Sequence, residues 1–317
     1  MAEANVAVHH SEPKVQVRGI VKNYGGVRAI VNADMDIYPG RVHALVGENG
    51  AGKSTLIKII AGAEKANAGT IRFDGEVVSI GSTGEAIELG VQTVYQEPQL
   101  FPALSVSENI FVGREITKNG RILWQEQADQ INELLDTVGL RSDIIATEVG
   151  SLSIAEQQQV SIAKALATDA SVLILDEPSA ILTDAEIEVL FSVIRRLKER
   201  GVAIIYISHR LDELFRIADD ITIMRDGETI DSRPIKELTV RQIAEMMVGG
   251  TLRDHAVERG YAAEEKVLTL AGWTLPGHFE DISLDVARGE IVGVFGLVGS
   301  GAESIAGAIF GMTDIPE

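Results

Sequence analysis

Residues 47–55 have the types and the spacing of side chains that bind a phosphate group. They fit the pattern G-x-x-x-x-G-K-[ST] without a gap, between an apolar run at 42–46 and a helical apolar pattern at 56–60. The glycines let backbone N–H groups turn toward phosphate oxygens, and the N-terminus of the following helix attracts the same anion. Lys53 supplies a positive charge, and the Ser54 hydroxyl is placed to ligate Mg²⁺. This setting disfavours the alternative, a glycine-rich turn without a ligand. The predicted binding residues are Gly47, Glu48, Asn49, Gly50, Ala51, Gly52, Lys53, Ser54 and Thr55.

Two adjacent carboxylates follow another apolar run. Asp176 and Glu177 come directly after residues 172–175, a short continuous apolar stretch typical of a buried parallel strand. An aspartate at such a strand end can hold the Mg²⁺ shell, and a neighbouring glutamate can polarise an attacking water. An ordinary acidic turn before Pro178 is the alternative, and the phosphate-binding pattern upstream favours the catalytic interpretation.

Three further residues are candidates only in combination with these motifs. His209 follows the strand-like run 204–208 and can contact a γ-phosphate or its water, although a lone histidine there is more often structural. Gln96 can reach Mg²⁺ or the attacking water, but a single glutamine carries almost no signal. Tyr24 can stack on an adenine face, with a core tyrosine as the equal alternative. We therefore predict Glu177, His209 and Gln96 as catalytic candidates, Tyr24 as a nucleotide contact, and Ser54, Gln96 and Asp176 as Mg²⁺ ligands.

Strand-like patterns place these residues on a sheet. Residues 15–37 alternate between apolar and polar side chains, with Gly25-Gly26 as a break, which predicts a hairpin. Residues 70–75 predict a strand that enters a turn, and residues 202–207 predict a second buried strand.

Helical patterns lie between the strands. Residues 98–166 are predicted to be mostly helical, and a second helical stripe over 187–197 ends at Gly201. Thr239 and Gln242 predict a capping box for a helix that ends near Gly249. The alternation of strands and helices predicts an α/β fold with a mostly parallel core sheet. The expected apolar stripe of the first helical region is Trp124, Ala128, Ile131, Leu135 and Val138.

Composition limits the function classes. A chain of 317 residues is long enough for about two domains. Its net charge of −19 argues against a nucleic-acid partner and against direct adhesion to acidic lipid headgroups. Cysteine is absent, which excludes disulfides and thiolate metal sites. No stretch of the sequence reaches the ~18–20 apolar residues that span a bilayer.

The chain contains an internal repeat. Residues 288–301 parallel residues 39–52 at an offset of 249 residues. In the second loop, Ala302 stands at the position of Lys53 and Glu303 at that of Ser54, so phosphate and Mg²⁺ binding there is not expected. The second copy ends about 15 residues after its loop, which is too early to close a sheet.

The order of these motifs resembles the ATP-binding cassette superfamily over residues 14–250, and again over residues 266–317. In chain order the matching pieces are Tyr24, 47–55, Gln96, 152–157, 176–177, 179–183 and His209. The chain is most similar to the double-cassette ATPases of bacterial monosaccharide importers, the ribose, galactose, xylose and autoinducer-2 group. Residues 96–98, 208–213 and 225–227 and the lysine-free second loop carry that similarity.

The resemblance implies a P-loop NTPase fold with a RecA-like core, an antiparallel β subdomain and a helical subdomain at about 98–166. The implied organisation is a mobile tail at 1–13, a first ATP-binding cassette at 14–250, a linker at 251–265 and an incomplete second cassette at 266–317 with a degenerate phosphate loop. The implied cofactors are ATP and Mg²⁺.

The same resemblance implies that ATP hydrolysis drives an integral membrane permease from the cytoplasmic face of the cell membrane, where the protein would be peripheral. A periplasmic or extracellular sugar-binding protein would feed the permease, and two cassettes would dimerise. One alternative is a soluble tandem-cassette ATPase that acts on ribosomes or DNA, which the charge of −19 and the short linker disfavour. Another is a nucleotide-dependent regulatory module with little turnover.

One segment departs from the superfamily pattern. The signature segment, usually L-S-G-G-Q, reads Leu-Ser-Ile-Ala-Glu over residues 152–156. Each added Cβ hinders the close approach of the backbone to a γ-phosphate. In the family, ATP lies between the phosphate loop of one cassette and the signature of another. The altered signature would then face the second loop, and the intact loop would face a signature beyond Glu317.

Overall fold

The computed structural model describes residues 12–250, 265–296 and 299–312. The chain forms two compact units, unit 1 (Met1–Leu252) and unit 2 (Arg253–Glu317). The expected tail at 1–13 and the expected linker at 251–265 fall almost wholly outside the described residues.

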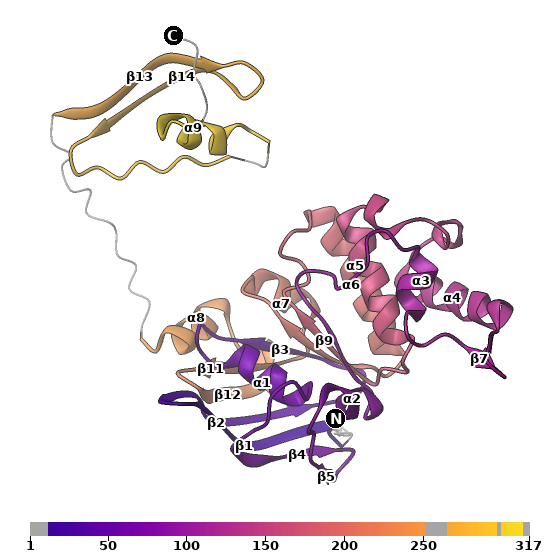
Figure 1. Ribbon diagram of the computed structural model, residues 1–317. Coiled ribbons are helices and arrows are strands. Elements are labelled where there is room, and N and C mark those ends of the chain that lie inside the picture. The colour runs from indigo at the N-terminus through magenta and orange to yellow at the C-terminus, as the bar shows by residue number, and fades with distance from the viewer. Residues whose placement is uncertain (1–11, 251–264, 297–298, 313–317) are drawn as a thin grey trace, which may run out of the picture. The chain divides into compact units, whose positions relative to one another are not determined.

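One sheet of ten strands organises unit 1 (Figure 1). Its order is β5-β4-β1-β2-β12-β11-β3-β10-β9-β6. The neighbours from β11 through β3, β10 and β9 to β6 pair in parallel, whereas β5, β4, β1 and β2 pair antiparallel. The strands are β1 (Val15–Tyr24), β2 (Val27–Ile37), β3 (Val42–Val46), β4 (Ala68–Phe73), β5 (Glu76–Val78), β6 (Val91–Val94), β9 (Val172–Asp176), β10 (Ala203–Ile207), β11 (Asp220–Arg225) and β12 (Glu228–Pro234).

The two halves of this sheet meet at β12. This strand pairs antiparallel with β11, and its Glu228 pairs with Asn32 of β2. The hydroxyl of Thr229 in β12 adds hydrogen bonds to the backbone of Asp34 in β2. The sequence-based prediction of an α/β fold with a mostly parallel core and an antiparallel β subdomain is therefore confirmed.

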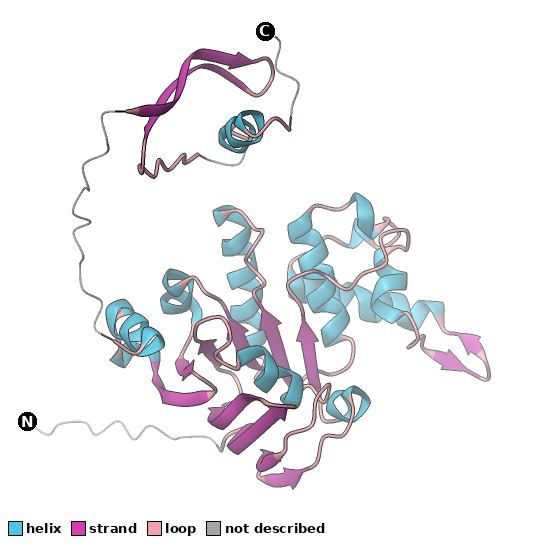
Figure 2. Cartoon of the chain, turned by 60° about the vertical axis from the view of Figure 1, so that its left-hand side comes forward, coloured by secondary structure: helices cyan, strands magenta, loops and turns pink. Residues whose placement is uncertain are grey.

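Helices cover both faces of the parallel half (Figure 2). Alternate residues of each strand point to opposite faces. Leu173 and Tyr206 pack with Phe191 of α6 in one core, while Ile174 and Ile205 join the α1 side chains in another. This explains why these strands read as continuous apolar runs. The helices are α1 (Lys53–Ile60), α2 (Thr83–Glu88), α3 (Val106–Phe111), α4 (Trp124–Val138), α5 (Ile154–Leu166), α6 (Asp184–Glu199), α7 (Leu211–Ile217) and α8 (Val240–Val248).

The region predicted to be mostly helical contains α3, α4 and α5, which gather beside α6 in Figure 1. It also holds a short hairpin of β7 (Thr117–Lys118) and β8 (Arg121–Ile122) that the sequence did not predict. The prediction that Trp124 belongs to the buried stripe was wrong, because its side chain is 66% exposed. Trp124 is the first residue of α4, and the buried stripe begins one turn later at Gln127.

Unit 2 contains a hairpin of β13 (Lys266–Leu275) and β14 (Phe279–Ala287), followed by α9 (Ala302–Ile309). The predicted repeat is confirmed here, since α9 spans the same positions as α1 at the offset of 249 residues. Residues 291–295 correspond to β3 but form no strand, and among the described residues of unit 2 none lies alongside them as a partner strand. Ile291 and Phe295 are accordingly 97% exposed.

Candidate functional site

The phosphate-binding pattern lies where it was predicted, between β3 and α1. Two of its glycines are fixed by close backbone contacts. A Cβ on Gly47 would lie 2.3 Å from the carbonyl oxygen of Met224, and a Cβ on Gly52 would lie 2.8 Å from that of Ala29. Gly52 also has a φ of 101°, a left-handed conformation that favours glycine. No larger residue fits at either position without moving β2 or β11.

Lys53 reaches back across its own loop. Its Nζ donates hydrogen bonds to the carbonyl oxygens of Gly47 at 2.7 Å and Glu48 at 3.0 Å. Burial lowers the pKa of Lys53, and the charges of Glu177 and Asp176 act in the opposite direction. The lysine therefore shares one electrostatic site with the two predicted carboxylates.

A cavity of about 550 Å³ lies beside this loop. The β1–β2 hairpin forms one of its walls and the loop forms the other. Tyr24 is exposed in this wall, with the Nζ of Lys22 4.8 Å from the centroid of its ring. A flat aromatic face and a row of backbone amides thus border the same space. The lining residues are Tyr24, Val27, Arg28, Ala29 and residues 49–55.

Asp176 and Glu177 lie at the carboxyl end of β9, close to the loop. In the sheet register Asp176 is opposite Ile207 of β10, which is opposite Leu45 of β3. Parallel strands in register place their carboxyl ends at one edge, where ligands bind in open α/β sheets. Burial and the charge of Glu177 raise the pKa of Asp176, while Lys53 lowers it.

Glu177 and His209 face each other across this edge. The Nδ1 of His209 lies 3.5 Å from the Oε2 of Glu177. The backbone of Glu177 is left-handed, with a φ of 48°, and its N–H donates to the carbonyl oxygen of Ile207 at 3.0 Å. This hydrogen bond joins the turn after β9 to the end of β10. The structure thus brings Glu177 and His209, two of the predicted catalytic candidates, close together.

Gln96 is not joined to this cluster. It follows β6, the edge strand, and its side chain is exposed. Within the described residues, no hydrogen bond or ion pair links Gln96 to Lys53 or Asp176. Its assignment to the catalytic and Mg²⁺-binding groups stays a prediction.

The signature segment forms the start of α5. Ser153 is the N-cap, and the carboxylate of Glu156 accepts from the backbone N–H of Ser153 at 2.9 Å and from its hydroxyl at 2.8 Å. Glu156 therefore folds back on its own helix. The sequence carried this signal, because Ser-x-x-Glu before a helical run is a capping box.

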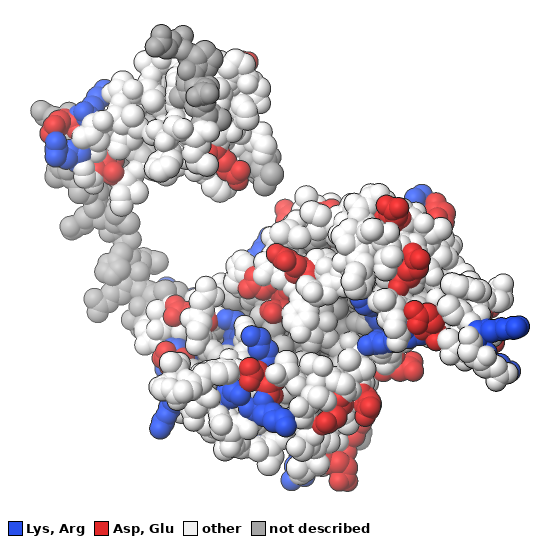
Figure 3. Space-filling view, in the orientation of Figure 1, with Lys and Arg blue, Asp and Glu red and all other residues white. Residues whose placement is uncertain are grey.

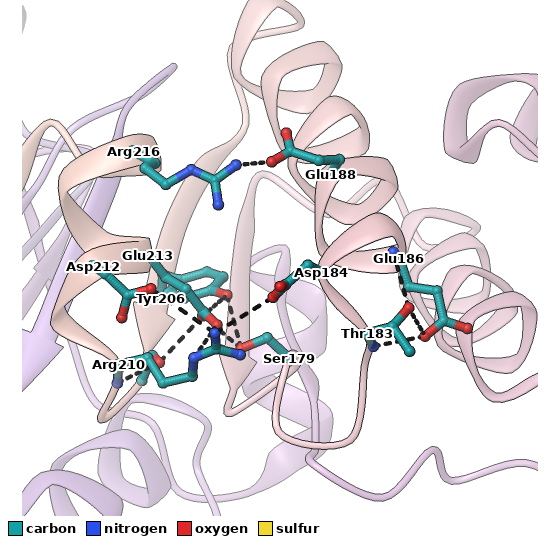
Figure 4. A network of polar contacts seen from close by, with 11 residues as sticks. Ser179, Thr183, Asp184, Glu186, Glu188, Tyr206, Arg210, Asp212, Glu213 and Arg216 are labelled. Carbon is teal, nitrogen blue, oxygen red and sulfur yellow. Dashed lines mark hydrogen bonds and ion pairs between the residues drawn. The ribbon is translucent and has the colours of Figure 1, made fainter. Parts of the chain in front are cut away.

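Sequence reasoning missed one buried group beside the site. Glu213 of α7 is fully buried and accepts hydrogen bonds from Ser179 and Tyr206 (Figure 4). Burial raises the pKa of Tyr206 above its usual value, so its hydroxyl stays a donor. Tyr206 could have indicated such a group from the sequence, because a tyrosine hydroxyl in a buried apolar strand needs a polar partner.

Comparison with known proteins shows what this chain is similar to. A sequence model described as ABC transporter matches residues 30–180. The ribose import ATP-binding protein RbsA 3 of Rubrobacter xylanophilus is 46% identical over 300 residues, which are 95% of this chain and 60% of that protein. The ribose import ATP-binding protein RbsA 1 of Streptomyces coelicolor is 44% identical over 303 residues, with 95% and 60% covered. The chain thus spans about 60% of the length of these relatives.

Solved structures are similar to unit 1. An ATP-binding cassette of an ABC transporter in its ADP conformation aligns with a TM-score of 0.67 and 26% identity, over 75% of this chain and 100% of that chain. A nucleotide-free ATP-binding cassette aligns with a TM-score of 0.65 and 26% identity, over 74% and 98%. The shared fold, the phosphate loop and the paired carboxylates agree with the match to the family model. Residues 30–180 thus match the ABC transporter family, and unit 1 has the fold of an ATP-binding cassette.

Proposed function

We propose that this chain is an ATP-hydrolysing part of a bacterial importer for a monosaccharide or a related small sugar, including autoinducer-2-like compounds. It would couple ATP binding and hydrolysis to movement of a permease. The observation that carries the proposal is that Lys53, Asp176 and Glu177 share one electrostatic site beside His209. The names of the relatives, ribose import ATP-binding proteins, support the sugar class.

The cavity beside the loop suits a nucleotide. We assign the adenine face to Tyr24, which borders the cavity opposite the loop. The backbone N–H groups of residues 47–55 and the Lys53 ammonium would hold the phosphates. Lys53 would exchange its two carbonyl acceptors for phosphate oxygens, which are stronger acceptors.

The donor set fits Mg²⁺ bound together with ATP. The raised pKa of Asp176 reflects burial next to a second carboxylate, and a divalent cation would offset that charge. Among the described residues, no three or more His, Asp or Glu side chains gather into a metal cage, which agrees with an ion held mainly by phosphates and waters. Ser54, Asp176 and Gln96 are its proposed protein contacts. The ion would neutralise charge on the phosphates.

Glu177 and His209 would act on the attacking water and the γ-phosphate. Glu177 would orient the water and accept its proton. A carboxylate can act as a general base when it lies within hydrogen-bond distance of that water. His209 would contact the γ-phosphate from the other side. With 3.5 Å between the Nδ1 of His209 and the Oε2 of Glu177, the two side chains are close enough to contact one reacting group.

The proposed partners are integral membrane permease subunits, a second cassette, and indirectly a periplasmic or extracellular sugar-binding protein. The proposed location is the cytoplasmic face of the cell membrane. In the part of the chain that the structure describes, we find no helix with the length and hydropathy to cross a membrane. Acidic and basic side chains are interspersed over the face shown in Figure 3, which supports the proposal that nucleic acid is not a partner.

Two measurements test the proposal. MgATP hydrolysis by the purified chain is expected to be measurable and to disappear without Mg²⁺. Affinity capture of the chain from bacterial membranes is expected to retain an integral membrane permease. Capture of ribosomes instead, or the absence of any nucleotide binding, would contradict the proposal.

A further inference from the structure

A single buried carboxylate, that of Glu213, is hydrogen-bonded to both of the turns that carry Glu177 and His209. We propose that Glu213 is a positioning residue, which sets the separation of Glu177 and His209 for the reaction. This inference rests on the proposed ATPase function. Glu213 itself touches neither the cavity nor the loop described above.

The contacts of Glu213 converge from both turns (Figure 4). Its Oε2 accepts hydrogen bonds from the hydroxyls of Ser179 at 2.6 Å, Tyr206 at 3.2 Å and Ser208 at 3.4 Å. The residue has no exposed surface. Hydrogen bonds have preferred distances and angles, so three of them to one oxygen fix the positions of the three hydroxyl groups. Apolar packing alone has no such directional preference.

These donors lie next to the proposed catalytic groups. Ser179 is two residues after Glu177, and Ser208 directly precedes His209. The first turn follows β9 and the second follows β10, which are neighbouring parallel strands. Besides the backbone hydrogen bond from Glu177 to Ile207, Glu213 is thus a second link between the two turns.

Arg210 balances the buried charge. Its Nε lies 3.0 Å from the Oε1 of Glu213, and its Nη2 lies 3.7 Å from a carboxylate oxygen of Asp184 at the start of α6. Arg210 directly follows His209, so the ion pair also holds the histidine turn from its other side. The carboxylate of this ion pair is buried, while the Arg210 side chain is 36% exposed. Burying a charge is a costly way to stabilise a fold, and one of the attested uses of such pairs is to specify a single arrangement. That use fits two turns that must keep a fixed distance.

The test replaces Glu213→Gln, which keeps the shape of the side chain and removes its charge. The matched control is Asp212→Asn, one residue earlier in α7. The Asp212 side chain is 70% exposed and its Oδ2 lies 3.9 Å from the Nη2 of Arg210, so this change also removes a charge beside Arg210 but leaves the hydroxyl donors of Glu213 untouched. For Glu213→Gln we expect kcat for ATP to fall at least about tenfold, because misplacement by a fraction of an ångström is costly in catalysis. We expect the Kd for a fluorescent ATP analogue to stay unchanged, and Asp212→Asn to behave as the wild type.

Two further readouts separate positioning from general destabilisation. In a Glu177→Gln background, the second change Glu213→Gln is expected to cause no additional loss of kcat, because both act on one step. The NMR signals of the His209 ring, recorded without nucleotide, are expected to shift in Glu213→Gln and not in Asp212→Asn. The second readout does not depend on hydrolysis, so the positioning inference can be judged even if the wild type proves inactive and the proposed function fails.

Three results would overturn the inference. They are an unchanged kcat with unshifted His209 signals, a loss of kcat that adds fully to that of Glu177→Gln, and a loss that matches the unfolded fraction in thermal denaturation. If Glu213→Gln does not fold, Ser179→Ala carries the same comparison, since it removes the 2.6 Å donor to Glu213 together with the 3.4 Å acceptor of the Tyr206 hydroxyl and leaves the buried carboxylate in place.

Discussion

The ammonium group of Lys53 donates a hydrogen bond of 2.7 Å to the backbone carbonyl of Gly47, in the loop that Lys53 itself closes. The second acceptor is the carbonyl of Glu48 at 3.0 Å. Both acceptors lie on the loop, so the positive charge is held over the loop before any phosphate arrives. Binding then requires an exchange of acceptors and no large movement of the side chain.

The first prediction follows from that arrangement. Lys53→Ala is expected to weaken ATP binding at least about tenfold, because a hydrogen bond to a charged group contributes about 1.5–3 kcal/mol. Lys58→Ala is the control, since this lysine lies in the same helix with an exposed side chain.

Glu177→Gln should leave ATP affinity intact and slow hydrolysis by about 10²–10⁴, because only the water-orienting carboxylate is changed. Equal losses of nucleotide affinity in Lys53→Ala and Glu177→Gln would contradict this division of roles.

The second prediction compares two glycines of the same loop. Gly50 and Gly52 both have positive φ values, 86° and 101°. A Cβ on Gly50 would meet no atom within 4 Å, whereas one on Gly52 would lie 2.8 Å from the Ala29 carbonyl oxygen. Both alanine variants bear a left-handed strain of about 1–2 kcal/mol. Gly52→Ala should lose about 1–3 kcal/mol more in urea unfolding, since the backbone of β2 has to move. Equal unfolding free energies would show that the contact with Ala29 is unimportant.

A third prediction concerns the buried histidine of β3. Burial lowers the pKa of His43 from 6.5 to about 4, and its Nε2 shares a hydrogen bond of 2.7 Å with the hydroxyl of Thr222. The unfolded chain therefore binds this proton at a higher pH than the folded chain does. The stabilising effect is complete above pH 6.5 and is lost as the pH falls from about 6.5 to about 4. We expect His43 to account for a loss on the order of 3 kcal/mol over that interval.

The measurement is the free energy of unfolding by urea at several pH values, for the wild type and for His43→Gln. The variant is expected to be less stable at pH 7 and to show a flatter pH dependence in the acid range. Parallel pH curves for wild type and His43→Gln would rule out His43 as the titrating group.

Much of the site could be predicted because each residue follows an apolar run. The runs at 172–175 and 202–207 had to be buried parallel strands, and parallel strands end at one edge, so Asp176 and His209 had to approach the loop. Glu213 could not be predicted in the same way. Its burial depends on the packing of α7 against β10, which no local pattern encodes. The prediction for Trp124 was wrong for a related reason. Periodicity alone does not show at which residue a helix begins to pack against its neighbours.

The last prediction concerns the signature segment, which opens α5. Ile154 is the first residue of that helix and its side chain is 49% exposed. Glu156 is directed at Ser153, so its charge is already engaged by two hydrogen bonds. The hindrance to a γ-phosphate from another cassette should therefore come from the Cβ atoms at 154 and 155 and less from the carboxylate.

We expect the double change Ile154→Gly and Ala155→Gly to raise ATP turnover of this chain at least about tenfold, since loss of one preorganised donor costs about 10²–10³ in other enzymes. The glycines should cost about 1 kcal/mol each in helix stability, which thermal denaturation would reveal. Glu156→Gln keeps an acceptor for Ser153 and should leave the turnover unchanged. A rise with Glu156→Gln, and none with the glycines, would instead assign the hindrance to the carboxylate. In that case the capping box seen here would have to open when two cassettes meet.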